Sequence, residues 1–148
     1  MKSAARQGAA LAAVAAAGLL GVPTLAAAQA PAAGPCGAAI VGAQRIEGAR
    51  DVVAFAPQPA PWVLGQHVAV EFEVCPKAGA ALPEQVRIDA RMPEHGHGMN
   101  YRPSLQARGP GRWRAEGLML HMAGRWELSF ELRRGDQMDR LTRDIQAR

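Results

Sequence analysis

The stretch HVAVEFEVCP, at residues 67–76, constrains the fold of this 148-residue chain more than any other segment. Its apolar side chains recur at every second position, and glutamates occupy positions between them. The residues on the apolar side are Val68, Val70, Phe72 and Val74, and the acids on the other side are Glu71 and Glu73. A period of two residues is typical of a β-strand with one face in the core and one in solvent. The segment therefore predicts a half-buried strand.

The same alternation returns at residues 85–92 and again from Arg125, where Trp126 leads the apolar face and is predicted to lie in the core. No segment after the first 28 residues shows a capped 3.6-residue period, although residues 38–50 are interpreted as containing a short helix. Short strands at a spacing of roughly ten residues favour an all-β fold. We expect an antiparallel β-sandwich of the immunoglobulin or cupredoxin kind with about seven strands, with a small barrel as the alternative.

The amino terminus has the layout of a secretory signal peptide. Lys2 and Arg6 precede an apolar run, no acid is present, and small residues follow, so residues 1–28 are predicted to be removed on export. The run is short and rich in alanine, so we expect no retained membrane span. Residues 29–37, rich in Pro, Ala and Gly, are interpreted as a flexible tether, and residues 38–148 as a single sandwich domain.

The charge of the chain argues against a nucleic-acid partner. The formal net charge is +4, and the predicted signal peptide carries two bases and no acid, so the mature chain is nearly balanced. The arginines are spread along strand-like segments and do not form a basic run. We therefore expect no binding to nucleic acid.

The two cysteines, Cys36 and Cys75, both lie in the exported part of the chain. An isolated pair in an oxidising compartment forms a disulfide in most proteins, so we predict a bond between them. Two thiolate metal ligands are the rival interpretation, although neither cysteine belongs to a C-x-x-C motif. Pro35 stands directly before Cys36, where a lipidated cysteine requires a small residue. The sequence predicts a soluble periplasmic protein.

The segment RMPEHGHGMNY, at residues 91–101, is the first candidate for a metal site. If it is extended, the side chains at alternate positions, His95, His97 and Met99, share one side. The intervening glycines also allow the backbone to bend around an ion. Imidazole binds copper in either oxidation state, whereas a thioether is soft and favours Cu(I). A mixed set therefore predicts copper, and Cu(I) in particular, over zinc.

The segment GLMLHMAGRW provides a second group of ligands, His121 with Met119 or Met122. We expect the imidazoles of His95, His97 and His121 to converge at one end of the sandwich, because adjacent loop residues alone rarely enclose an ion. Other interpretations remain open. His95 and His97 could be solvated turn residues that bind no metal. Alternatively, the three histidines could hold a zinc ion with a bound water. Met122 could pack in the core and not bind a metal. His67 has no partner nearby in sequence and is interpreted as a surface residue.

The segments MPEHGHGMNYRPSL and GLMLHMAGRWELSFEL resemble the YtkA-like domain family, which is similar to FixH-like proteins. The resemblance covers roughly residues 64–134. The matching loop residues are Met92, Pro93, His95, Gly96, His97, Gly98 and Met99, and the matching turn residues are Met122, Gly124 and Trp126. The resemblance implies a small exported β-sandwich associated with copper handling and with assembly of respiratory oxidases. FixH-like proteins keep a membrane anchor, which this chain is expected to lack.

These observations predict a copper-binding protein that carries or buffers Cu(I) through His95, His97, Met99, His121 and Met122. No nucleophile with a base and an orienting group is evident, so we expect no enzymatic activity. The expected partner is a protein of copper delivery or oxidase assembly. The alternative function is a metal-free interaction domain whose glycine-rich loop contacts another protein.

Overall fold

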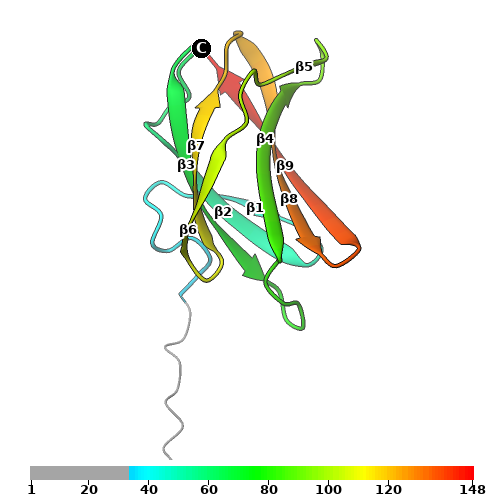
Figure 1. Ribbon diagram of the computed structural model, residues 1–148. Helices are drawn as coiled ribbons and strands as arrows, with labels where there is room; N and C mark the ends of the chain where they lie inside the picture. Colours follow the sequence, from blue (N-terminus) through cyan, green and yellow to red (C-terminus); the bar gives the residue numbers. More distant parts are fainter. Residues whose placement is uncertain (1–33) are drawn as a thin grey trace, which may run out of the picture. The chain divides into compact units, whose positions relative to one another are not determined.

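The computed structural model describes residues 34–148, which form two antiparallel β-sheets (Figure 1). Within this range there is no α-helix, and hence no helix that is long and apolar enough to cross a membrane. The predicted signal peptide, residues 1–28, lies outside the described residues, as do positions 29–33 of the predicted tether.

The first sheet has five strands in the spatial order β1-β2-β3-β7-β6, and the second has four in the order β5-β4-β8-β9. The strands of the first sheet are β1 (Gln44–Glu47), β2 (Asp51–Gln58), β3 (His67–Pro76), β6 (Ser104–Gly109) and β7 (Arg112–Met119). Those of the second are β4 (Gln85–Met92), β5 (His97–Gly98), β8 (Gly124–Arg134) and β9 (Gln137–Ala147). The predicted antiparallel β-sandwich is therefore confirmed, with more strands in the described chain than the expected seven.

The prediction of a short helix within residues 38–50 is wrong. This segment makes a turn and then β1, whose residues pair with β2 from Val52 to Phe55. Gly37 and Gly42 have φ angles of 80° and 71°, a left-handed conformation that suits turns and interrupts a helix. Since β1 completes the edge of a sheet, its backbone groups gain partners that the local sequence does not reveal.

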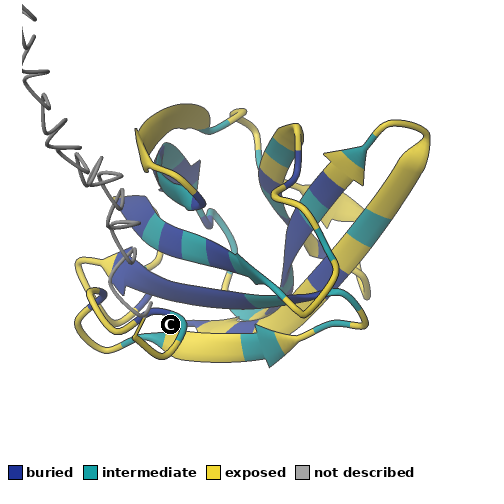
Figure 2. Cartoon of the chain, turned by 90° about the horizontal axis from the view of Figure 1, so that it is seen from below, coloured by how far each residue is buried: buried dark blue, intermediate teal, exposed yellow. Residues whose placement is uncertain are grey.

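The predicted apolar faces meet in the core between the sheets. Val70 and Phe72 of β3 are at most 1% exposed, and Trp126 and Phe130 of β8 are fully buried. The ring centroids of Phe72 and Phe130 lie 5.2 Å apart across the two sheets. Figure 2 shows the resulting alternation of buried and more exposed positions along the strands. The core position predicted for Trp126 is confirmed.

The predicted disulfide is present between Cys36 and Cys75, with the two Cα atoms 5.9 Å apart. It fastens the first described residues to the last part of β3. The amide of Gly37 also donates a hydrogen bond of 2.8 Å to the carboxylate of Glu73, next to the bond. The segment around Cys36 is therefore held by both a covalent bond and a hydrogen bond.

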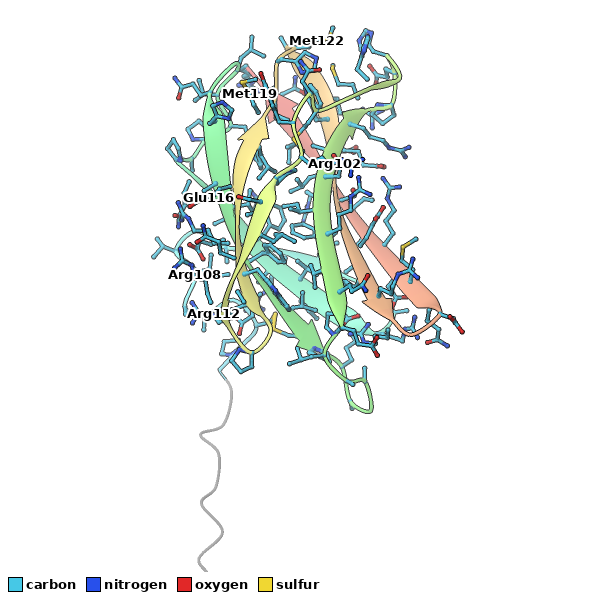
Figure 3. The ribbon with its side chains drawn as sticks, in the orientation of Figure 1. Arg102, Arg108, Arg112, Glu116, Met119 and Met122 are labelled. Atoms are coloured by element: carbon cyan, nitrogen blue, oxygen red, sulfur yellow. A yellow bond between two sulfur atoms is a disulfide. The ribbon has the colours of Figure 1, made fainter. Side chains whose placement is uncertain are left out.

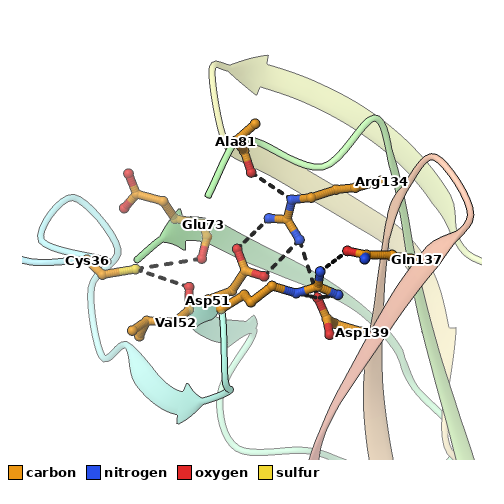
Figure 4. Close-up of polar contacts among 9 residues, drawn as sticks. Cys36, Asp51, Val52, Glu73, Ala81, Arg134, Gln137 and Asp139 are labelled. Atoms are coloured by element: carbon orange, nitrogen blue, oxygen red, sulfur yellow. Dashed lines mark hydrogen bonds and ion pairs between the residues drawn. The ribbon is translucent and has the colours of Figure 1, made fainter. Parts of the chain in front are cut away.

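A group of ion pairs lies at the same end of the sandwich as the disulfide (Figure 4). Arg134 donates to both carboxylate oxygens of the fully buried Asp51, at 2.6 and 3.0 Å. Arg50 donates to Asp139 at 2.7 Å, and this hydrogen bond is the main reason why the pKa of Asp139 is lowered, against the effect of burial. We name this region, with Cys36 and Cys75, the disulfide end.

Candidate metal centre

The opposite end of the sandwich collects the histidines and most of the methionines, and we name it the His/Met end. It is the end at which β3 and β8 begin and β4 and β7 finish. The amide of Leu64, just before β3, donates to the carbonyl of Arg148, just after β9, so the two sheets meet here. Figure 3 places Met119 and Met122 at this end and Arg112 at the other. The residues of the His/Met end are His67, His95, His97, His121, Met92, Met99, Met119 and Met122.

His95 and His97 lie next to each other on the loop that follows β4. Their ring centroids are 6.4 Å apart and their planes are inclined by 26°. Gly96 between them has a φ of 66°, which a residue with a side chain rarely adopts, so the chain turns at this point. His97 then pairs with Met92 as part of β5. Both histidines are exposed, and their imidazoles are accessible from solvent.

Met99 does not continue this row of side chains into solvent. Its amide donates to the carbonyl of Ala90 at 3.2 Å, and its side chain is partly buried against the core. The expected arrangement, with His95, His97 and Met99 on one side, requires an extended chain, and the turn at Gly96 interrupts it. Met99 therefore packs inward, whereas the two histidines face solvent.

His121 lies on the connection between β7 and β8, against the core tryptophan. Its ring centroid is 5.4 Å from that of Trp126, and the two planes are nearly perpendicular, at 77°. The Trp126 indole donates a hydrogen bond of 2.9 Å to the carbonyl of Met122, which fixes this connection. Nδ1 of His121 is buried, and no hydrogen-bond partner for it is found among residues 34–148. A buried nitrogen without a partner costs about 1–3 kcal/mol, so its retention calls for a reason.

Met92 connects the two segments that carry the predicted ligands. It pairs with His97 on one side, and it is only 1% exposed. A Cβ atom placed on Gly124 would lie 2.9 Å from the Cε of Met92, so the end of β4 packs tightly against the start of β8. Met92 is thus a core residue, and it brings the loop of His97 close to the connection that carries Met122.

An ion pair holds the histidine loop over β8. Arg125 donates to Glu94, the residue before His95, at 3.0 Å, and to Asp144 of β9 at 3.1 Å. The hydrogen bond that Arg125 donates to Glu94 is the first cause of its raised pKa, followed by the one that it donates to Asp144. Glu94 is therefore paired with the guanidinium of Arg125, and this ion pair helps to hold the exposed loop in one conformation.

The predicted ligands lie at the same end of the sandwich, but within residues 34–148 the three imidazoles do not form a close cluster. In the described part of the chain, one group of at least three His, Cys, Asp or Glu side chains has ligand atoms within 4.8 Å of one another, and it is Cys36, Glu73 and Cys75. The sulfurs of that group are bonded to each other, so they are not thiolate ligands. The convergence of His95, His97 and His121 on a single ion stays a prediction.

His67 is the histidine that sequence reasoning set aside. It is exposed, as expected, but it lies at the first position of β3, at the same end as the other three. Its ring centroid is 5.9 Å from that of Tyr101, which follows Met99 in the loop. No local motif links His67 to this loop, because the contact depends on how the two sheets meet.

Comparisons with known proteins leave the family of the chain open. No family model matches it, and neither does any curated protein. Among solved structures it is similar to a DUF4785 family protein from Legionella pneumophila, with 9% identity and a TM-score of 0.47. The alignment covers 68% of this chain and 29% of that protein, so the chain spans less than a third of its length. At this level of similarity the alignment says nothing about function.

Proposed function

We propose that this protein is an exported, soluble β-sandwich that binds one copper ion, as Cu(I), at the His/Met end and carries or buffers it in the periplasm. The observation that carries the proposal is the collection of all four histidines and four of the six methionines of the chain at that end. The proposed ligands come from His95, His97, Met99, His121 and Met122. The resemblance to YtkA-like domains points in the same direction.

The chemistry of these groups suits Cu(I). Thioether sulfur and imidazole nitrogen are the soft and borderline ligands that Cu(I) prefers, whereas Mg²⁺ and Ca²⁺ require oxygen ligands. The buried Nδ1 of His121 is a donor atom held without a competing hydrogen bond among the described residues. Met99 and Met122 are partly buried, so they offer sulfur at the boundary between core and solvent. The exposed histidine loop lies at the same end of the sandwich, so its imidazoles would complete the ligand set.

The disulfide supports export, because such bonds persist in oxidising compartments. It also removes both thiols from competition for copper, since the described residues contain no free cysteine. The proposed site therefore depends on nitrogen and thioether ligands alone.

The test is a Cu(I) titration of the purified, oxidised protein against the chelator bicinchoninate, under anaerobic conditions. We expect one equivalent of Cu(I) to be withdrawn from the chelator, and the variant His95→Ala/His97→Ala/His121→Ala to bind at least tenfold more weakly. Met138→Leu is the matched control, because this methionine is 54% exposed at the start of β9, away from the His/Met end. A titration in which the protein takes no Cu(I) would reject the proposal and favour the metal-free interaction domain.

A further inference from the structure

His67 and Met119 are directly opposite each other in the sheet, although they are far apart in sequence. The register of β3 and β7 pairs His67 with Met119 and Val68 with Leu118. Val68 and Leu118 are buried, at 2% and 0% exposed. Because successive side chains of a strand point to opposite faces, His67 and Met119 both point to the outer face of the five-stranded sheet. Side chains opposite each other in an antiparallel pair have Cβ atoms about 5 Å apart, within reach of a shared ion.

The imidazole of His67 is available for binding. It forms no hydrogen bond or ion pair with another residue of the described range. Tyr101 lies beside it, with its ring inclined by 57° to the imidazole, and limits the positions that the ring can take. His67 and Tyr101 line an open hollow of about 610 Å³, together with Arg102 and Glu116. Met119 is half-buried at the end of β7, where Figure 3 labels it.

This pair is separate from the proposed copper site, but close to it along the chain. His67 and Met119 belong to the five-stranded sheet, whereas His97 pairs with β4 of the other sheet. Met119 precedes His121 by two residues, and Tyr101 follows Met99 by two. The loop that follows β4 and the end of β7 with its connection to β8 therefore supply residues to both sites. The His67–Met119 pair lies at the surface of the sheet, and the proposed copper site lies at the end of the sandwich.

We propose that His67 and Met119 form a second, solvent-exposed site for Cu(I), at which the ion is received or released next to the His/Met end. The inference extends the proposed copper function, and it rests on that function for the identity of the metal. An imidazole nitrogen and a thioether sulfur are a matched ligand pair for a soft monovalent ion. Because a pair of ligands at the surface holds an ion more weakly than a larger, partly buried set, the second site fills after the first.

Silver(I) is the probe, because it binds the same ligands as Cu(I) and is not oxidised in air. In the full protein with labelled methionine methyl groups, we expect the nuclear magnetic resonance signals of Met99 and Met122 to shift with the first equivalent of Ag(I). The Met119 methyl and the His67 ring should shift together with the second. Met138 is the internal control and should not respond.

The variant His67→Ala should weaken the response of Met119 at least tenfold and leave that of Met99 and Met122 unchanged. The converse variant, His95→Ala/His97→Ala/His121→Ala, should lose the first response and keep the second. A Met119 signal that stays in place up to several equivalents of Ag(I), or that shifts equally in His67→Ala, would overturn this inference. The response of Met99 and Met122 reports separately on the proposed function, so the two failures are distinguishable.

Discussion

Asp51 at the disulfide end and His121 at the His/Met end each have a buried polar atom, and the surroundings of the two atoms differ. Asp51 is fully buried and accepts two hydrogen bonds from Arg134. Nδ1 of His121 is also buried, yet it has no partner among residues 34–148. Burial of a polar group costs free energy unless the group is hydrogen-bonded. That cost is offset at Asp51 by its two hydrogen bonds, whereas at Nδ1 of His121 it is not offset by a bond to any described residue.

The same difference extends to the neighbours of each residue. At the disulfide end, Arg50, Arg134 and Asp139 form a connected set of ion pairs beside a covalent bond. At the His/Met end, the core tryptophan and the packing of Met92 hold the backbone, and within residues 34–148 the imidazoles make no hydrogen bond or ion pair. The first end is therefore held by ionic and covalent bonds, whereas the second is held by apolar packing and, under the proposed function, leaves its imidazoles free for copper.

The largest expected effect is that of Trp126→Ala, which should lower the free energy of unfolding by about 3–5 kcal/mol. The indole is fully buried, it packs against His121, and its nitrogen holds the carbonyl of Met122. Urea unfolding followed by circular dichroism measures the loss. A loss below about 1 kcal/mol would show that the His/Met end does not depend on this residue.

Replacing both cysteines, Cys36→Ser/Cys75→Ser, should cost about 2–4 kcal/mol, because the loop that the bond closes gains freedom in the unfolded state. Copper binding should be unchanged, since the disulfide lies at the opposite end from the proposed ligands. Urea unfolding and the Cu(I) titration measure the two quantities in parallel. A folded double variant with weaker copper binding would contradict the separation of the two ends.

A smaller effect, of about 1 kcal/mol or less, is expected for Asp139→Asn. The hydrogen bond from Arg50 lowers the pKa of Asp139 below its ordinary value, so the ionised form stabilises the fold. This contribution is present above the unfolded pKa and is lost as the pH falls through the lower, folded value. The difference in unfolding free energy between wild type and variant should therefore be full at neutral pH and shrink below about pH 4. A difference that is unchanged at low pH would exclude the ion pair as its source.

The smallest expected effect is that of His121→Leu, with a change between zero and about 1 kcal/mol in the stabilising direction. The substitution removes a buried nitrogen that has no partner within the described chain and adds apolar contact with Trp126. Thermal unfolding without metal measures the change, and Cu(I) affinity should fall in the same protein. Met138→Leu is the control for both measurements. A clear loss of stability would show that the imidazole has a structural role.

The strands were predictable where the pattern is local. The stretches at residues 67–76 and 85–92 coincide with β3 and β4, because alternation of apolar and polar side chains directly reflects a strand with one buried face. The segment at 38–50 was predicted wrongly, because β1 exists only where β2 offers a free edge. A strand that depends on its neighbour leaves a weak pattern in its own residues.

The identities of the candidate ligands also came from local sequence, since His95, His97, His121 and Met122 stand in two short and distinctive segments. The arrangement of these side chains in space could not be predicted from local sequence. The turn at Gly96 directs Met99 inward, and no spacing rule predicted this. His67 was set aside because its neighbour Met119 is distant in sequence and adjacent only through the pairing of β3 with β7.

By itself, therefore, the sequence determined the all-β class, the buried faces and the pair of cysteines, because each depends on side-chain type at fixed local spacing or on there being only two thiols. The tertiary structure decided which end of the sandwich each residue occupies. Strand order and register bring His67 to Met119 and Met92 to Gly124, and they separate Cys75 from every histidine. Such contacts arise from the packing of two sheets, whose free energy is spread over many apolar side chains and is encoded in no single motif.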